Sequence, residues 1–223
     1  MPYSLVITNC SKMKKFDVNQ KNILKILKEH GLPIPKFNIE LEETYKKILA
    51  EYILPAAEMY GGTFIHVRKL VESLRKAGFK VDFLIISARY GVIDENTLII
   101  PYDASFSNMS DEYVITIAKK LKIFNTLINK IKDKYYDIAI ITLSEKYMKT
   151  IFNPTYGWDF TKYLRTRKLI IIGNGILKNK INYPNLEYYV VKGIGERIKV
   201  LNTITQRLSG IGRRKTTLDT YLV

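Results

Sequence analysis

The sequence has 223 residues, of which 47% are hydrophobic, and a formal net charge of +15. This composition excludes a disordered chain, which needs low hydrophobicity, and the apolar runs are shorter than the roughly 18 residues of a membrane span. A single cysteine excludes an internal disulfide framework and favours a reducing, cytoplasmic compartment. The first residues lack the basic segment and cleavage site of a secretory signal, so we expect them to form a strand.

The positive charge is concentrated toward the C-terminus. Residues 160–223 contain 13 Lys or Arg and 3 Asp or Glu. Such a surface attracts polyanions because their counterions are released on binding, which predicts DNA as a partner. The alternative explanation is a lysine-rich proteome, in which basic proteins are common without binding nucleic acid.

Segments with the pattern of strands alternate with segments of helical pattern. In chain order we predict a strand at 3–8, helices at 20–30, 41–59 (with a break near Pro55) and 63–77, a strand at 81–86, a helix at 110–131, strands at 138–143, 169–172 and 186–191, and a helix at 196–208. The strands are apolar throughout, which is typical of a mostly parallel sheet covered by helices on both faces. We therefore predict one α/β domain over 1–208 and a tail over 209–223.

Polar side chains gather where the second predicted strand ends. Ser87 and Tyr90 follow the apolar run, and a short loop then delivers Tyr102 and Asp103. Open α/β sheets place their ligand sites at strand ends. Asp103 or Asp94 could act as a general base that orients water, and the tyrosines could stack a base or donate a hydrogen bond. The predicted catalytic residues are therefore Asp103, Tyr102, Tyr90, Ser87 and Asp94; the alternative is a structural loop in which Asp103 caps a helix.

Cationic and aromatic residues elsewhere are candidates for contacts with DNA. The stretch 192–197 has the Gly-Ile-Gly pattern of a helix-hairpin-helix turn, whose backbone N–H groups can bind a phosphate. The tryptophan lies in an aromatic loop, 153–160, that could stack bases or could instead pack on its own aromatic residues. Arg and Lys side chains could hold phosphates directly. The predicted nucleic-acid-binding residues are Lys12, Lys14, Arg89, Lys192, Arg197 and Trp158.

Four separated motifs appear in a fixed order. Ser87-Ala-Arg-Tyr-Gly-Val-Ile, followed by Ile100-Pro-Tyr, and the segment 142–147 resemble the S-x-x-Y-G-V/L-L…I-x-P-Y and L-A-S-N-E-Y motifs of the YaaA (peroxide-stress protein) family. The segments 10–14 and 57–64 are similar to the C-x-x-x-K and A-x-x-L-Y-x-x-x-F motifs of a related uncharacterised domain family, whose third motif is S-A-K/R-Y-G-L…P-Y-D. The resemblance implies an α/β fold like that of uracil-DNA glycosylase and implies DNA binding, without a particular reaction. Asp103 stands where YaaA proteins usually have Arg, so the chemistry of that family does not transfer directly.

The titratable residues do not favour a cofactor. Cys10, beside two lysines, could be a nucleophile, but a partly buried structural cysteine is the preferred interpretation because no histidine is near it in sequence. With one Cys and two His, we expect neither a zinc site nor an iron–sulfur cluster. The chain lacks a Walker-type phosphate loop. We predict no cofactor, with carboxylate-only Mg²⁺ binding as an open alternative.

The last eleven residues resemble the peptide by which archaeal and eukaryotic DNA-processing proteins bind the sliding clamp (PCNA), Q-x-x-h-x-x-a-a. Leu218, Tyr221 and Leu222 occupy the hydrophobic positions, and Lys215 replaces the usual glutamine. Positions i, i+3 and i+4 share one face of a helical turn, which can fill a hydrophobic pocket. The alternative is a last helical turn that packs on its own domain.

Three functions fit these observations. The first is an enzyme of DNA repair or modification that is recruited by the clamp and hydrolyses an N-glycosidic bond in a flipped nucleotide, as a DNA glycosylase does. The second is a non-catalytic DNA-binding adaptor or stress protein. The third is an enzyme that acts on free nucleotides or nucleosides.

Overall fold

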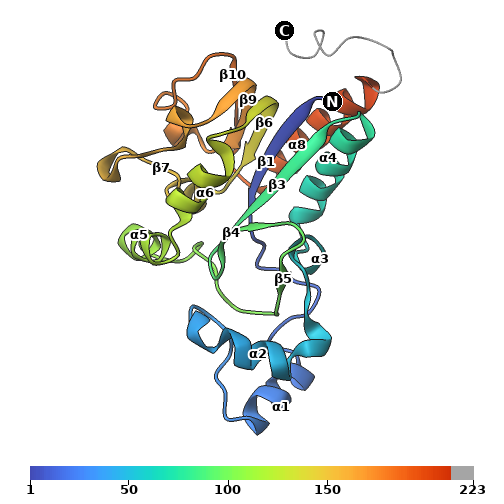
Figure 1. The fold of residues 1–223 in the computed structure, drawn as a ribbon, viewed down its shortest axis with the longest axis vertical. Coiled ribbons are helices and arrows are strands. Elements are labelled where there is room, and N and C mark those ends of the chain that lie inside the picture. Colours follow the sequence, from blue (N-terminus) through green and yellow to red (C-terminus); the bar gives the residue numbers. More distant parts are fainter. Residues whose placement is uncertain (212–223) are drawn as a thin grey trace.

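The structure is a computed structural model that describes the backbone of residues 1–211 and the side chains of residues 1–208. Six strands form its main sheet (Figure 1). Their order across the sheet is β10 (Leu186–Val190), β9 (Arg165–Gly173), β6 (Tyr135–Thr142), β1 (Tyr3–Asn9), β3 (Lys80–Ser87) and β4 (Gly91–Asp94). Neighbouring strands are parallel except β3 and β4, which are antiparallel. The prediction of a single α/β domain with a mostly parallel sheet is confirmed.

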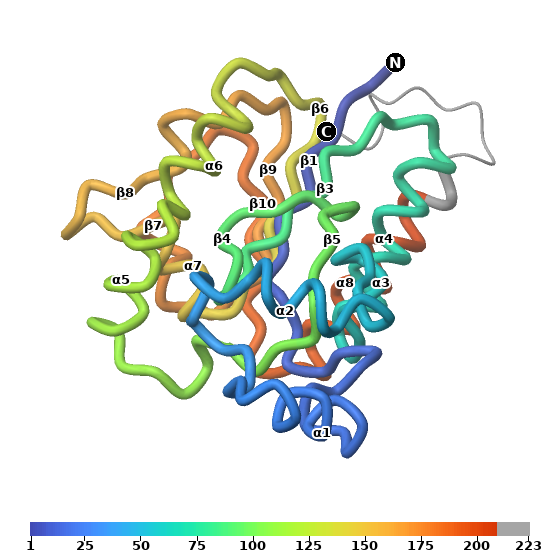
Figure 2. Tube along the Cα trace, turned by 60° about the horizontal axis from the view of Figure 1, so that its bottom comes forward, coloured from blue at the N-terminus to red at the C-terminus, as the bar shows by residue number. Residues whose placement is uncertain are grey.

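Helices cover both faces of this sheet. In Figure 2, α4 (Phe64–Lys76) and α8 (Ile194–Ile211) lie on one side of the strands, whereas α5 (Asp111–Lys120) and α6 (Ile123–Ile131) lie on the other. The apolar residues of α4 recur every three or four positions, so one stripe of the helix is buried. The central strands are buried over most of their length, and the buried part of each coincides with an apolar run, as expected of strands covered on both faces.

A carboxylate fixes the end of the sheet at which β1 begins. Asp82, near the start of β3, accepts hydrogen bonds from Tyr3 Oη (2.6 Å), Tyr136 Oη (2.8 Å) and Lys134 Nζ (2.6 Å). Burial opposes ionisation of this carboxyl, but the three donors together hold the pKa of Asp82 below its usual value. The three donors come from β1, from β6 and from the turn before β6, so Asp82 ties three chain segments together.

The predicted helix over 110–131 is two helices. α5 ends at Lys120 and α6 begins at Ile123, because Lys122 has a φ of 51°, a left-handed conformation that no α-helix continues through. The turn between them packs against the start of β4. There Gly91 has a φ of 71°, and a Cβ on it would lie 3.0 Å from the carbonyl oxygen of Leu121. Gly91 is therefore required both by its backbone angle and by this close approach.

The predicted helix over 41–59 is also divided. It consists of η1 (Ile39–Leu41), α2 (Glu42–Ile48), η2 (Ala50–Tyr52), β2 (Leu54–Pro55) and α3 (Ala56–Met59). The break expected near Pro55 is present, because this residue pairs with β5 (Leu98–Ile99) in a two-stranded sheet. The α-helix itself ends seven residues earlier, at Ile48.

Helices α1 (Lys21–Glu29) and α2 form a lobe with its own small core. The buried residues of this lobe are Val18, Ile23, Leu27, Tyr45, Leu49 and Ile100. Figure 1 shows the lobe at the end of the molecule toward which β1 runs, beyond the carboxyl ends of the parallel strands. The lobe therefore borders the edge of the sheet at which α/β proteins bind ligands.

The remaining elements are short. They are α7 (Glu145–Met148), β7 (Phe152–Asn153), η3 (Pro154–Tyr156), β8 (Trp158–Asp159), η4 (Phe160–Lys162) and η5 (Gly175–Leu177). Across residues 1–211, none of the helices combines the length and the apolar character needed to cross a lipid bilayer.

Candidate functional site

The topology creates a crevice between the carboxyl ends of β1 and β6. The chain leaves β1 toward β3 on one side and leaves β6 toward β9 on the other, so the order of the strands reverses between these two neighbours. Ligands of open α/β sheets bind at such a reversal. A cavity of about 300 Å³ lies there, lined by the residues that follow both strands and by the first residues of α4 and α8.

The wall of this first cavity is cationic and rich in hydroxyl groups. Arg197, in the first turns of α8, donates hydrogen bonds to Thr142 Oγ1 (2.9 Å), to the carbonyl of Leu143 (3.1 Å) and to that of Ile172 (3.3 Å). These acceptors are neutral, so they fix the guanidinium without neutralising it, and burial lowers the pKa of Arg197. Lys12 is exposed at the rim. The hydroxyl groups that line the cavity come from Thr8, Ser11, Thr63, Ser105, Ser107, Thr142, Ser144 and Tyr147.

A second cavity, of about 330 Å³, adjoins the first. The two share Lys12 and Met13 in their walls. The second cavity is also lined by Asp103, Asp17, Lys14 and Tyr102. The backbone N–H of Asp103 donates to the carbonyl of Pro35 (2.8 Å). This hydrogen bond ties Asp103 to the segment between α1 and α2 of the lobe. A wall with cationic and hydroxyl groups and a wall with two aspartates therefore lie on either side of the shared residues Lys12 and Met13.

Two of the predicted catalytic residues form a buried hydroxyl network. Tyr102 Oη lies 2.9 Å from Ser87 Oγ and 2.8 Å from Tyr60 Oη. Ser87 Oγ also accepts from the backbone N–H groups of Arg89 (3.2 Å) and Tyr90 (3.1 Å). Burial raises the pKa of Tyr102 well above its usual value, so its hydroxyl stays protonated. Ser87 and Tyr102 hold the loop that presents Asp103, and the ring of Tyr102 is covered by Lys14, which excludes base stacking on that face.

The prediction that Arg89 contacts a phosphate is wrong. Its side chain is fully buried and forms an ion pair with Glu42 on α2 (Nη2–Oε2 2.7 Å). It also donates to the carbonyl of Lys36 (2.6 Å) and to Asn38 Oδ1 (3.2 Å). Tyr90 is likewise occupied, because its hydroxyl donates to Glu42 (2.8 Å). Both residues fasten the end of β3 to the lobe; Glu42 carries no distinguishing pattern in the sequence.

The prediction that Asp94 shares the site is also wrong. Strand β4 runs antiparallel to β3, so Asp94 pairs with Leu84 and lies at the opposite end of the hairpin from Ser87. Asp94 is exposed and forms an ion pair with Lys130 (2.7 Å). Of the two predicted carboxylates, Asp103 therefore lines the second cavity, whereas Asp94 lines neither of the two cavities described above.

The stretch 192–197 is not a helix-hairpin-helix turn, because the element before it is a strand. β10 ends at Val190 and α8 begins at Ile194. Lys192 is exposed, and its backbone N–H donates to Glu196 Oε2 (2.7 Å), which occupies part of the predicted phosphate site. Arg197 contributes to the first cavity by its side chain instead.

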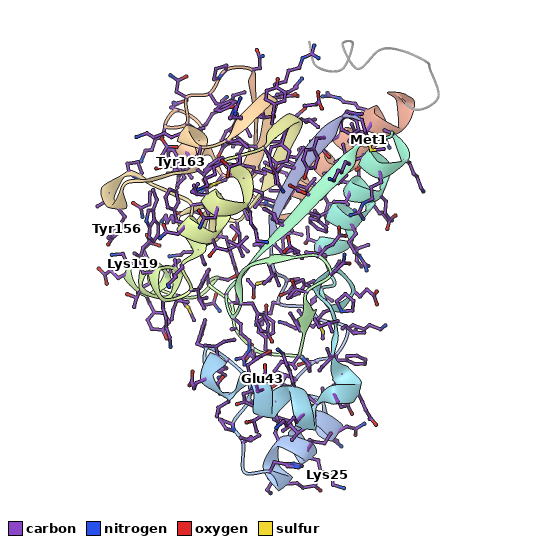
Figure 3. The ribbon with its side chains drawn as sticks, viewed as in Figure 1. Met1, Lys25, Glu43, Lys119, Tyr156 and Tyr163 are labelled. Carbon is purple, nitrogen blue, oxygen red and sulfur yellow. The ribbon has the colours of Figure 1, made fainter. Side chains whose placement is uncertain are left out.

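The aromatic loop packs against its own neighbours. Trp158 stacks on Phe124 of α6 (6.0 Å between ring centroids, 13° between planes) and contacts Tyr156 (5.6 Å). Lys119 of α5 lies over the ring of Tyr156 (4.3 Å), and Figure 3 shows these two residues at the left edge of the molecule, apart from the lobe at the bottom. Of the two interpretations, the packed loop describes Trp158, and this residue does not line either cavity.

Cys10 is buried in the wall of the first cavity. Its Sγ lies 3.1 Å from Tyr147 Oη, and the preferred interpretation as a structural cysteine agrees with this burial. Within residues 1–211, no group of three or more His, Cys, Asp or Glu side chains gathers in a way that could hold a metal ion. The clamp-binding candidates Lys215, Leu218, Tyr221 and Leu222 lie outside the described residues.

The hydroxyl groups around the first cavity were missed from the sequence. Thr63, Ser105, Ser107 and Ser144 belong to three separate loops, and isolated Ser and Thr residues in loops are common. The usable signal was that Thr63 and Ser144 lie within segments already singled out by their motifs. Ser105 and Ser107 become recognisable only once the loops are brought together.

Comparisons with known proteins identify one family. Residues 46–168, more than half of the chain, match the model of "Family of unknown function (DUF6884)". No curated protein matches the chain. A solved structure of a mutant of the PilB minor pilin from Streptococcus sanguinis is similar at 9% identity and a TM-score of 0.36, over 96% of this chain and 63% of the pilin. The chain thus spans less than two thirds of that pilin, and a similarity at this score supports no functional argument.

Proposed function

The chain belongs to this family of unknown function, and we propose from its own site that it is a DNA-binding enzyme that processes a base in DNA repair or modification, by hydrolysing an N-glycosidic bond. The observation that supports this most is the junction of a cationic cavity with a carboxylate cavity at Lys12 and Met13. The two parts of a nucleotide match these two cavities: the phosphate suits the cationic cavity, and the sugar–base unit suits the carboxylate cavity. A fold related to that of uracil-DNA glycosylase belongs to the same proposal.

The first cavity would hold the phosphate. Arg197 and Lys12 would supply charge, and the surrounding hydroxyl groups would donate hydrogen bonds to the phosphate oxygens. A hydrogen bond to a charged group contributes about 1.5–3 kcal/mol. Loss of Lys12 should therefore weaken nucleotide binding by roughly tenfold to a hundredfold.

The second cavity would hold the sugar–base unit, with Asp103 as the catalytic residue. Its carboxylate would orient a water molecule for attack at C1′ and stabilise the positive charge that develops on the sugar as the base leaves. Tyr102 and Ser87 would act as positioning residues, because their hydroxyl groups are turned into the network beneath the loop.

Base release tests the catalytic part of the proposal. The full chain is incubated with oligonucleotides that contain uracil, hypoxanthine or oxidised bases, and free base is measured. We expect release by the wild type, loss of release in Asp103→Asn, and retention in the matched control Asp94→Asn, whose carboxylate is exposed and remote. Equal effects of the two substitutions, or no release from any substrate, would reject this reaction and leave a non-catalytic DNA-binding role.

DNA binding and its location form the second part. The net charge of +15 supports binding to a polyanion, and the affinity should fall steeply with salt because counterions are released. Lys12→Ala should weaken binding, whereas Lys76→Ala should leave it within about twofold, because Lys76 is exposed and lies at the end of α4 opposite the residues that line the first cavity. An equal loss in both variants would mean that the cavities do not recognise DNA. A cytoplasmic location follows from the same proposal.

Recruitment by the sliding clamp rests on the sequence of the tail alone. We expect a clamp of the PCNA type to be retained by the full chain and lost when residues 213–223 are removed. Replacement of Leu218, Tyr221 and Leu222 together by alanine keeps the length of the chain and should also abolish retention of the clamp. Clamp retention by the truncated chain would rule out this peptide.

A free nucleotide or nucleoside is the second candidate substrate. A cavity of about 300 Å³ is large enough for such a ligand without a polymer attached. Thermal unfolding with nucleosides and nucleotides separates the two candidates. Stabilisation by a mononucleotide, with no binding to oligonucleotides, would favour this second function.

A further inference from the structure

Lys14 is held in a fixed position by the backbone on either side of it. Residue 14 forms an antiparallel bridge with Tyr60, the N–H of Gly61 donates to the carbonyl of Met13 (3.0 Å), and the N–H of Lys15 donates to the carbonyl of Met59 (2.7 Å). A side chain that starts from such a segment loses less entropy when it is ordered than one on a mobile loop. The structure therefore presents the amine of Lys14 at a defined point.

That point is a wall of the carboxylate cavity. The Nζ of Lys14 lies 4.1 Å from the centroid of the Tyr102 ring and donates to the carbonyl of Ser11 (3.3 Å). Asp103 and Asp17 line the same cavity. The amine thus faces the space in which the proposed function places the sugar of a nucleotide.

Burial distinguishes Lys14 from the neighbouring lysines. Lys12 and Lys15 are exposed, whereas Lys14 is half-buried against an aromatic ring. Burial lowers the pKa of Lys14, and this effect exceeds the opposing influence of Cys10, Asp103 and Asp17. A larger share of Lys14 is therefore neutral near pH 7 than of an ordinary lysine, and the neutral amine is the nucleophilic form.

We infer that Lys14 forms an imine with the C1′ aldehyde of a deoxyribose that has lost its base. The inference rests on the proposed function, because removal of a base leaves a sugar that opens to this aldehyde. The lone pair of the amine attacks C1′, the carbonyl oxygen takes up both amine protons and leaves as water, and a C=N bond replaces the C=O bond. No oxidant or reductant is consumed.

Borohydride trapping tests this step directly. The full chain is incubated with an oligonucleotide that contains one abasic site, and sodium borohydride reduces the imine to a stable amine. The covalent complex is quantified on a denaturing gel and located by mass spectrometry of its peptides. We expect the modification on Lys14 in the wild type, a result that needs no variant to fold.

Substitutions provide matched comparisons. Lys14→Arg keeps the positive charge over the Tyr102 ring but is not nucleophilic, so trapping should fall by roughly tenfold or more. Lys15→Arg, the same change at the adjacent exposed lysine, should trap within about twofold of the wild type. Thermal unfolding of each variant verifies that it folds.

Two results would overturn the inference. One is a covalent complex located on another lysine or on the N-terminal amine; the other is failure to trap while the abasic oligonucleotide remains bound. Base release is measured separately, because the abasic substrate bypasses that reaction. Release without trapping would reject the role of Lys14 alone, and trapping without release from any base would reject the glycosidic reaction alone.

Discussion

Replacement of Glu42 by Gln should destabilise the protein far more than the same change at the adjacent Glu43. The Glu42 carboxylate accepts from Arg89 Nε (3.3 Å), Arg89 Nη2 (2.7 Å) and Tyr90 Oη (2.8 Å). The side chain of Arg89 is 0% exposed and that of Glu42 is 11% exposed, so solvent cannot replace the lost charge. The side chain of Glu43 is 82% exposed, and within the described residues its ion-pair partner is Lys46.

The expected size follows from the burial of this ion pair. Removal of one member of a buried pair costs about 3–5 kcal/mol, because the other charge stays buried without compensation. Glutamine keeps the shape and one acceptor, which places Glu42→Gln near the lower value, about 3 kcal/mol. Glu43→Gln should cost less than about 0.5 kcal/mol, as exposed pairs do.

Urea unfolding followed by fluorescence measures the difference. With an m-value of about 3 kcal/mol per molar, Glu42→Gln should lower the midpoint by about 1 M. Both substitutions remove one negative charge, so a general effect of net charge is the same in the two variants. Equal midpoints for Glu42→Gln and Glu43→Gln would refute the conclusion that Arg89 belongs to the core.

Three further changes address the site and the fold. Tyr102→Phe removes two buried hydrogen bonds and should destabilise the protein by about 1–3 kcal/mol. It should slow base release without abolishing it, because the loop that presents Asp103 is held less firmly, whereas Tyr135→Phe, at an exposed residue, should change neither. Complete loss of base release in a folded Tyr102→Phe protein would contradict a positioning role for this hydroxyl. Gly91→Ala should destabilise the protein more than Gly78→Ala, because both glycines have a positive φ but only at Gly91 would a Cβ lie against a carbonyl oxygen. Equal unfolding temperatures for the two variants would contradict this. The lowered pKa of Asp82 contributes stability above its unfolded-state pKa of about 4, which is lost as the pH falls through the folded-state pKa. The stability difference between wild type and Asp82→Asn, from urea unfolding, should therefore shrink progressively below pH 4; a difference that is constant down to pH 2 would contradict the assignment.

The strands and the long amphipathic helix could be predicted because their signal is local. The buried stripe of α4 and the apolar run of β3 each lie within a few consecutive turns or residues, and the structure agrees with both. The break at Lys122 could not be predicted, since lysine favours helices and the turn is imposed by packing against Gly91. Tertiary contacts decide such positions.

The candidate site was predicted in part for the same reason. Asp103 and Asp94 look alike in sequence, but the hairpin of β3 and β4 separates them in the structure. The available signal for this hairpin was the turn at Tyr90 and Gly91, followed by two apolar residues. Arg89 looks like a surface cation until Glu42, 47 residues away along the chain, is brought beside it. Burial of a charge depends on such a distant partner and leaves no local pattern.

The first cavity is built from both extremities of the described chain, Lys12 just after β1 and Arg197 in α8. A nascent chain emerging from the ribosome can assemble its N-terminal strands early. The cavity, however, has no complete wall until α8 has been translated and has docked beside α4. A nascent chain that has not yet reached α8 should therefore lack affinity for the ligand, however well its N-terminal strands have formed.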